Sequence, residues 1–250
     1  MTRTSLEDKV ALVTGGGGGI GSAICRRLAE AGAQVVVNYN RNAAKAQAVA
    51  DSLSGANHRV IQASVTDSSA LAQMAQQIAD DYGRLDLLVN NAGITRPVPH
   101  DDLAALDDAL IDEIFATNVR GAFAAIRAFK PLLMLSGDGL VINISSIAGR
   151  TGVGSNVAYC ASKAAMDSMT RSLARALAPE IRVVSVAPGW VWGDYAARFP
   201  EAYIQEQIAK TPLGRIAQPE DVAEAVHAVA TQLTFSTGCI IPVDGGRPLL

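Results

Sequence analysis

The sequence contains few cysteines and few aromatic residues, and the cysteine pattern in particular excludes whole classes of protein. Its three cysteines, Cys25, Cys160 and Cys239, are an odd and widely spaced set, which argues against a framework of disulfide bonds. No Cys/Cys or Cys/His pair has the spacing of a zinc site, so we expect no metal centre. The three histidines are scattered along the chain, and we expect them in surface or capping roles.

Long apolar runs and clusters of basic residues are also missing. No apolar run approaches the roughly 20 residues of a membrane-spanning helix, and the segment 1–9 lacks the apolar core of a secretory signal. The formal net charge is −3, and no run of basic residues is longer than Arg26-Arg27. We therefore expect a cytoplasmic protein that binds neither nucleic acid nor a membrane.

Apolar residues are plentiful and fall into alternating strand-like and helix-like segments. They make up 49% of the 250 residues, which is typical of a globular protein with a sizeable core. Short β-branched runs predict strands at Val10–Thr14, Gln34–Tyr39, Arg59–Ala63, Leu85–Asn90, Gly139–Ser145, Arg182–Ala187 and Gly238–Val243. Helical periodicity predicts helices at Ile20–Ala31, Ala43–Ser54, Ser68–Tyr82, Ala105–Leu135, Ala158–Ala178 and Pro219–Thr231.

This alternation predicts a single α/β domain over residues 1–250. The strand-like runs lack polar alternation, which is typical of parallel strands covered on both faces. We expect a doubly wound, Rossmann-like domain with a mainly parallel seven-stranded sheet and helices on both faces. Residues 190–212 interrupt the alternation and contain Trp192, Tyr195, Phe199 and Tyr203. Such an excursion predicts a substrate lid or binding loop within the domain.

A run of five glycines follows the first predicted strand and leads directly into a helix. A glycine run alone is also typical of a flexible linker, but the strand–turn–helix context favours a nucleotide-binding loop. Pyrophosphate binds the free N–H groups at a helix N-terminus, where side chains would block its approach. Asn90–Gly93 ends the fourth predicted strand, at the sheet edge where such domains bind ligands, although it could also be a simple polar turn.

Tyr159 and Lys163 lie four residues apart in a predicted helix, so their side chains share one face. An isolated pair of this kind is usually a surface pair. Two features favour a catalytic role besides the glycine loop. Ser145-Ser146 stands at the carboxyl end of the fifth strand, and Asn118 interrupts a predicted helix with a residue that disfavours helix.

These residue types suit the reduction of a ketone, which adds a hydride to carbon and a proton to oxygen. A tyrosine with a pKa of about 10 is too weak an acid for this unless cations stabilise its phenolate. Lys163 and the positive charge of an oxidised nicotinamide would do so. Ser146 would donate a hydrogen bond to the substrate oxygen as charge develops there. Tyr159 is therefore the expected acid/base.

Together these motifs resemble the classical short-chain dehydrogenase/reductase family over nearly the whole chain. The matching residues are Gly15, Gly19 and Gly21 in the pattern T-G-x-x-x-G-x-G, Asn90–Gly93, Asn118, Ser146, Tyr159, Lys163, Pro188-Gly189 and Val243–Gly246. The resemblance implies that Asn118, Ser146, Tyr159 and Lys163 are catalytic, with Asn118 holding a water that relays protons to Lys163. It implies cofactor contacts from Gly15, Gly19, Ile20, Gly21, Asn38, Tyr39, Arg41, Ser64, Val65, Asn91, Ala92, Gly93, Tyr159, Lys163, Pro188 and Gly189.

Two departures from the family pattern affect the cofactor. Members commonly carry Asp before Val in the adenine-contacting pair, where this chain has Ser64-Val65. They also often carry Thr a few residues after Pro-Gly, where this chain has Gly193. We therefore expect cofactor affinity or lid geometry to differ from the common pattern.

The residues after the second strand predict a preference for NADP over NAD. NAD-preferring enzymes place an acid there to accept the ribose 2′-hydroxyl, but this chain has Tyr39, followed by Arg41 and flanked by asparagines. No carboxylate would repel a 2′-phosphate, and Arg41 and the amides could bind it. Arg41 could instead be a solvated residue at a helix start, and Gly18 stands where NADP users often carry a basic residue.

The resemblance implies an oxidoreductase that transfers a hydride between NADP(H) and a ketone or secondary alcohol. Asn90–Arg96 and Pro212–Arg215 are similar to the reductases of 3-oxoacyl thioesters, whereas Pro97–Asp102 is not their usual continuation. A sugar or polyol dehydrogenase is the nearest alternative. A non-catalytic nucleotide-sensing regulator is another, but it would not need the four catalytic residues. The resemblance, with small residues in the long helices, also implies a homotetramer.

Overall fold

The computed structural model describes residues 5–193 and 196–249, and these contain one sheet of seven parallel strands. The strands are β1 (Val10–Val13), β2 (Gln34–Tyr39), β3 (Arg59–Gln62), β4 (Leu87–Asn90), β5 (Gly139–Ile144), β6 (Ile181–Pro188) and β7 (Ile240–Val243). They lie in the order β3-β2-β1-β4-β5-β6-β7, and every pairing is parallel. The strand order reverses between β1 and β4, and ligands bind such sheets at the carboxyl ends of the strands at this point.

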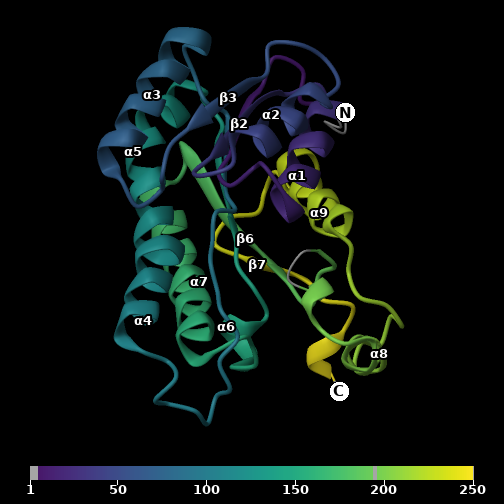
Figure 1. The fold of residues 1–250 in the computed structure, drawn as a ribbon. Helices are drawn as coiled ribbons and strands as arrows, with labels where there is room; N and C mark the ends of the chain where they lie inside the picture. Colours follow the sequence, from purple (N-terminus) through teal and green to yellow (C-terminus); the bar gives the residue numbers. More distant parts are fainter. Residues whose placement is uncertain (1–4, 194–195, 250) are drawn as a thin grey trace.

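Two layers of helices cover the faces of the sheet (Figure 1). One layer holds α1 (Gly19–Glu30), α2 (Ala43–Asp51) and α9 (Pro219–Thr231), and the other holds α3 (Ser68–Tyr82), α5 (Ala122–Leu135) and α7 (Val157–Leu177). Along β1, Ala11 and Val13 pack toward the first layer, and Val10 and Leu12 toward the second. Burial on both faces explains why the strands lack polar alternation, and the predicted doubly wound α/β fold is confirmed.

Local sequence signals set several helix ends. The Asp67 side chain accepts hydrogen bonds from the backbone N–H groups of Ser69 and Ala70 and so caps α3. Gly83 ends the same helix in the left-handed conformation, with a φ of 72°. Pro219 is the first residue of α9, where its missing N–H costs no hydrogen bond. The predicted boundaries at these residues are confirmed.

The single long helix predicted over Ala105–Leu135 is wrong. The segment contains α4 (Asp108–Phe115), a π-helical turn (Ala116–Gly121) and α5. Asp107 caps α4, because its carboxylate accepts a hydrogen bond from the N–H of Leu110, so the helix starts later than predicted. π turns interrupt the regular hydrogen-bond ladder and are frequent at functional sites, and this one contains Asn118.

Residues 190–212 contain more regular structure than the predicted loop. A 3₁₀ turn (Ala196–Arg198) and α8 (Glu201–Ala209) lie within them, and Tyr195 falls outside the described residues. Trp190 contacts the ring edges of Phe199 and Tyr203, at centroid distances of 5.4 and 5.7 Å. A short helix α6 (Ala148–Thr151), also not predicted, precedes α7. The two helices have only four and nine residues, which is too short for a clear helical period in the sequence.

One histidine does not have the expected surface or capping role. His227 of α9 is only 5% exposed, and its Nδ1 lies 2.9 Å from Nη2 of Arg27 on α1. It therefore belongs to the contact between the two helices. Among the residues described, no helix is both long and apolar enough to cross a membrane.

Candidate active site

The glycine loop between β1 and α1 has an inner side that is packed and an outer side that is open. A Cβ on Gly21 would lie 2.4 Å from the carbonyl oxygen of Gly15 and 2.6 Å from Nδ2 of Asn91. Gly18 and Gly19 are exposed, and a Cβ on either would have no atom within 4 Å. No side chain in the described part of the chain caps the start of α1. The free N–H groups and the open space fit the phosphates of a dinucleotide.

The turn after β4 holds this loop in place. Nδ2 of Asn91 donates to the carbonyl oxygens of Thr14 and Gly15, at 2.9 and 3.1 Å. The hydroxyl of Thr14 accepts from the backbone N–H groups of Asn91 and Ala92, each at 3.0 Å. The expected cofactor residues on β1 and β4 are therefore joined into one rigid unit.

Asn38 also holds the loop, and this corrects its expected role in binding the cofactor. It is 1% exposed, and its Oδ1 accepts a hydrogen bond from the N–H of Gly15 at 3.3 Å. Its Nδ2 donates to the carbonyl oxygens of Ile61 and Ala63. With the side chain used in this way, Asn38 is not available to a 2′-phosphate.

The remaining residues expected near the adenosine end differ in exposure. Tyr39 is half-buried at the end of β2, whereas Arg41 is exposed and forms no hydrogen bond or ion pair within the described residues. The hydroxyl of Ser64 lies 2.8 Å from that of Thr66, so the two side chains satisfy each other. Val65 is buried and packs against the π turn, 2.8 Å from where a Cβ on Gly121 would lie.

Asn156 positions the start of α7 and with it Tyr159. Its Oδ1 accepts from the N–H of Tyr159 at 2.7 Å, and its Nδ2 donates to the carbonyl oxygen of Arg96 at 2.8 Å. The helix is thus tied to the loop that follows β4. Since Asn is a preferred N-cap residue, its place before the apolar helix was the signal that could have identified it.

Lys163 lies one turn after Tyr159 on the same helix and is 5% exposed. Its Nζ donates to the carbonyl oxygen of Ile144 at the end of β5, at 2.7 Å, and lies 5.6 Å from the centre of the Tyr159 ring. Burial lowers the pKa of Lys163 to about 8, and the negative charge of Asp167 partly opposes this effect. The lysine therefore carries its charge at neutral pH beside the tyrosine.

Asn118 joins the π turn to both neighbouring parts of the site. Its Oδ1 accepts from the N–H of Ile94 at 2.8 Å, and its Nδ2 donates to the carbonyl oxygen of Ile94 and to the hydroxyl of Ser162, each at 3.1 Å. The side chain is fully buried. These bonds give Asn118 a positioning role, and the water relay implied by the resemblance stays a prediction.

Ser146 follows β5 and faces the end of β6. Its hydroxyl donates to the carbonyl oxygen of Pro188 at 3.4 Å and accepts from the N–H of Ala148 at 3.2 Å. The neighbouring Ser145 is buried and donates to the carbonyl oxygen of Lys163 at 3.4 Å. The four residues predicted to be catalytic thus come from the segment after β5, the π turn and α7, and all lie at the carboxyl edge of the sheet.

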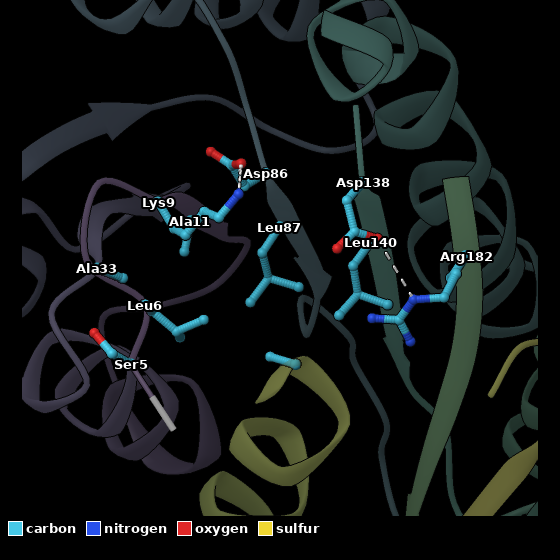
Figure 2. A pocket seen from close by; sticks show the side chains of 11 residues that line it. Ser5, Leu6, Lys9, Ala11, Ala33, Asp86, Leu87, Asp138, Leu140 and Arg182 are labelled. Carbon is cyan, nitrogen blue, oxygen red and sulfur yellow. Dashed lines mark hydrogen bonds and ion pairs between the residues drawn. The ribbon is translucent and has the colours of Figure 1, made fainter. Parts of the chain in front are cut away.

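A small cavity lies at the opposite, amino edge of the sheet (Figure 2). Asp86 accepts hydrogen bonds there from Nζ of Lys9 at 2.9 Å and from the N–H of Val10 at 3.0 Å. Asp138 lies 3.9 Å from Nε of Arg182. These charged groups pair across the starts of the strands, so they close the amino edge and take no part in the predicted site.

Comparisons with known proteins agree with this architecture. The family model described as enoyl-(acyl carrier protein) reductase matches residues 15–247. Over their full lengths, the chain is 41% identical to a Streptomyces violaceoruber protein that bears the name of granaticin polyketide synthase ketoacyl reductase 2. It is 36% identical to a 3-oxoacyl-[acyl-carrier-protein] reductase FabG of Staphylococcus aureus, covering 95% of this chain and 97% of that one.

A solved structure shows the same fold. A short-chain dehydrogenase/reductase from Burkholderia xenovorans superposes with a TM-score of 0.90 at 32% identity, covering 97% of this chain and 98% of that one. The similarity thus includes both the glycine loop and the edge that carries Ser146, Tyr159 and Lys163. The chain belongs to the short-chain dehydrogenase/reductase family and is an NAD(P)-dependent oxidoreductase that acts on ketones or alcohols.

Proposed function

We propose that this enzyme uses NADPH to reduce the ketone of a 3-oxoacyl thioester or a similar 3-oxo compound. The observation that carries the proposal is that Tyr159 and Lys163 share one face of α7 and that Lys163 contacts the end of β5, the strand that Ser146 follows, at the same sheet edge as the glycine loop. The relatives named as ketoacyl and 3-oxoacyl reductases support the substrate class.

The side chains of the site would handle the proton and the developing charge. The bound nicotinamide supplies the hydride. The Tyr159 hydroxyl gives its proton to the ketone oxygen, and the nearby ammonium of Lys163 makes the resulting phenolate tolerable. Ser146 turns its hydroxyl from the Pro188 carbonyl, a long contact of 3.4 Å, to the substrate oxygen.

The cofactor would lie across the carboxyl ends of β1 and β4. Its pyrophosphate would bind the N–H groups of Gly19, Ile20 and Gly21 at the start of α1, on the side of the loop that Gly18 and Gly19 leave open. Its nicotinamide end would lie near Pro188-Gly189, and its ribose hydroxyls near Tyr159 and Lys163. Its adenosine end would contact Gly15, Tyr39, Arg41, Ser64, Val65 and Asn91–Gly93.

We also propose that residues 190–212 form the lid over the substrate and that the enzyme works in the cytoplasm. The lid contains the packed ring group of Trp190, Phe199 and Tyr203, while Trp192 is 42% exposed beside it.

The free cysteines support the cytoplasmic location. Two of them are buried, and unpaired thiols suit a reducing compartment.

A substrate panel tests the function directly. Purified enzyme with NADPH would be assayed on 3-oxoacyl thioesters, diketones and sugars by the loss of reduced-nicotinamide absorbance. We expect kcat/KM to be highest on a 3-oxoacyl thioester. Oxidation of sugars or polyols with a higher kcat/KM would replace the proposal with the dehydrogenase alternative, and no turnover on any compound would contradict both.

Arg41 is expected to determine the preference for NADPH. Its exposed guanidinium can bind a 2′-phosphate, and a charge-assisted contact of about 1.5–3 kcal/mol corresponds to about 10- to 100-fold in affinity. Arg41→Ala should raise the KM for NADPH by that factor and leave the KM for NADH nearly unchanged. Tyr39→Asp should shift preference toward NADH, because a carboxylate repels the phosphate.

The matched control is Arg59→Ala, which removes an exposed arginine that pairs with Asp81 on the surface. It should change neither Michaelis constant. If the wild-type enzyme has a higher kcat/KM with NADH than with NADPH, the interpretation of the segment after β2 is wrong.

The enzyme is expected to form a homotetramer. Phe123 on α5 is 44% exposed, although it is a large apolar residue on a helix rich in alanine. Light scattering should give about four times the 26.0 kDa mass of one chain. Phe123→Asp should lower that mass, whereas Phe235→Asp, on the loop after α9, should not. A monomer mass for the wild type at micromolar concentration would refute the prediction.

A further inference from the structure

A second ionisable residue is buried next to the catalytic lysine. Asp167 lies on α7 one turn after Lys163, so Tyr159, Lys163 and Asp167 follow one another along the same face of the helix. Asp167 is 6% exposed, and among the described residues its Oδ1 has no hydrogen-bond partner. Aspartate is rarely buried to this extent unless another group compensates its charge.

The surroundings of Asp167 connect the helix to the two strands that lead into the site. Ser145, after β5, and Ser185, on β6, stabilise the charged form of its carboxyl group. Ser145 also reaches the carbonyl oxygen of Lys163 at 3.4 Å. Ser185 lies 2.8 Å from the hydroxyl of Thr170, one turn further along α7. The carboxyl group therefore lies where β5, β6 and α7 meet.

Two charged groups of the described residues act on this carboxyl, and both belong to α7. They are the exposed guanidinium of Arg171, which has the larger effect, and the buried ammonium of Lys163. From the sheet, the groups that face it are the two serine hydroxyls. Conversely, Asp167 is the charged group that acts on Lys163. Asp167 is thus the charge that offsets the buried ammonium of Lys163, whereas Arg171 and Lys163 together offset the charge of Asp167.

The effect of this pairing follows from the burial of both groups. Burial disfavours each charge, and it lowers the pKa of Lys163 and raises the pKa of Asp167. The opposite charge works against this shift in each case. Without the carboxylate, the buried ammonium would lose its proton at a lower pH and would no longer support a phenolate at Tyr159.

We propose that Asp167 is a positioning residue of the active site, whose buried carboxylate, one turn of α7 after Lys163, keeps the lysine ammonium charged beside Tyr159. The role of Asp167 rests on the proposed function in one respect: it assumes that the charged Lys163 supports catalysis by Tyr159. Its electrostatic part concerns the cofactor-free protein and can be measured without substrate.

The test is a titration of Lys163 by NMR, with lysines labelled with ¹³C at Cε. The chain has five lysines, and a Lys163→Arg variant identifies the resonance of Lys163. The wild-type protein should show a pKa near 8 at this position. Asp167→Asn, which keeps the shape and removes the charge, should lower that value by about one pH unit. Ser185→Ala, which removes a neutral partner of the carboxyl, should change it much less.

The outcomes separate an electrostatic role from a structural one. If the Asp167→Asn protein is folded and its Lys163 titrates as in the wild type, the proposal is overturned, even if the variant has lost activity. If the wild-type enzyme reduces none of the carbonyl compounds tested, the proposed function is contradicted. The titration of Lys163 would still stand, because it does not depend on turnover.

A second measurement on the wild-type protein covers the case in which Asp167→Asn does not fold. With aspartate carboxyl carbons labelled, the Asp167 resonance should change at the same pH at which Lys163 loses its proton, because the two charges are coupled. A resonance that stays constant through the Lys163 titration would overturn the proposal as well.

Discussion

Replacing Tyr159 by phenylalanine is expected to lower turnover by about 10²- to 10⁴-fold, the usual contribution of general acid catalysis. The ring would stay in place, since Asn156 holds the backbone N–H of this residue and not its hydroxyl. Binding of the dinucleotide should therefore change little. Steady-state rates and calorimetric cofactor titrations measure the two effects separately.

Two further variants define what this result means. Tyr82→Phe makes the same chemical change on α3, where the hydroxyl donates to the carbonyl oxygen of Asn57, and it should leave turnover unchanged. Lys163→Ala should reduce both turnover and cofactor affinity, because it removes the charge beside the phenolate and the expected ribose contact. Near-normal activity of the Tyr159→Phe enzyme would show that the proton comes from another group.

Gly21→Ala is expected to destabilise the glycine loop and to abolish most cofactor binding. The added Cβ would lie 2.4 Å from the carbonyl oxygen of Gly15, a backbone atom that Asn91 also binds. Overpacking of this kind costs about 1–3 kcal/mol of stability. The melting temperature of the cofactor-free protein should fall, and the Kd for the dinucleotide should rise at least about 10-fold.

Gly18→Ala is the matched control, because a Cβ on Gly18 has no neighbour within 4 Å and the backbone is extended, with a φ of −177°. The melting temperature of this cofactor-free variant should equal that of the wild type. Equal melting temperatures for Gly21→Ala and the wild type would show that the loop is not packed against Asn91 as described.

The inner strands β1, β2, β4, β5 and β6 could be predicted closely because burial on both faces leaves continuous apolar runs in the sequence. The glycine loop and the Tyr159–Lys163 pair could also be found, since each is a local pattern whose spacing follows from a turn or a helix. The interruption of the helix around Asn118 could be predicted only in part from the sequence. Its polar residue indicated a local function, but the π turn depends on contacts with Ile94 and Ser162.

The role of Asn38 could not be predicted for the same physical reason. Its neighbours in the sequence suggested a site for phosphate, whereas three of its side chain's four hydrogen-bond partners among the described residues, Gly15, Ile61 and Ala63, are more than 20 positions away. Thr14 is similar, because its partners lie after β4. Local propensity predicts elements and short motifs, but long-range hydrogen bonds decide which polar side chains remain available to a ligand.

The hydrogen bonds between Thr14 and Asn91 affect how the chain folds. The two residues are 77 positions apart, so the glycine loop can take its final shape only after β1 and β4 have paired. Closing so long a loop costs chain entropy before any contact compensates it, and such contacts slow folding. A dinucleotide will therefore recognise the completed fold but not partly folded chains. By mass action, the cofactor pool then stabilises the native enzyme against unfolding.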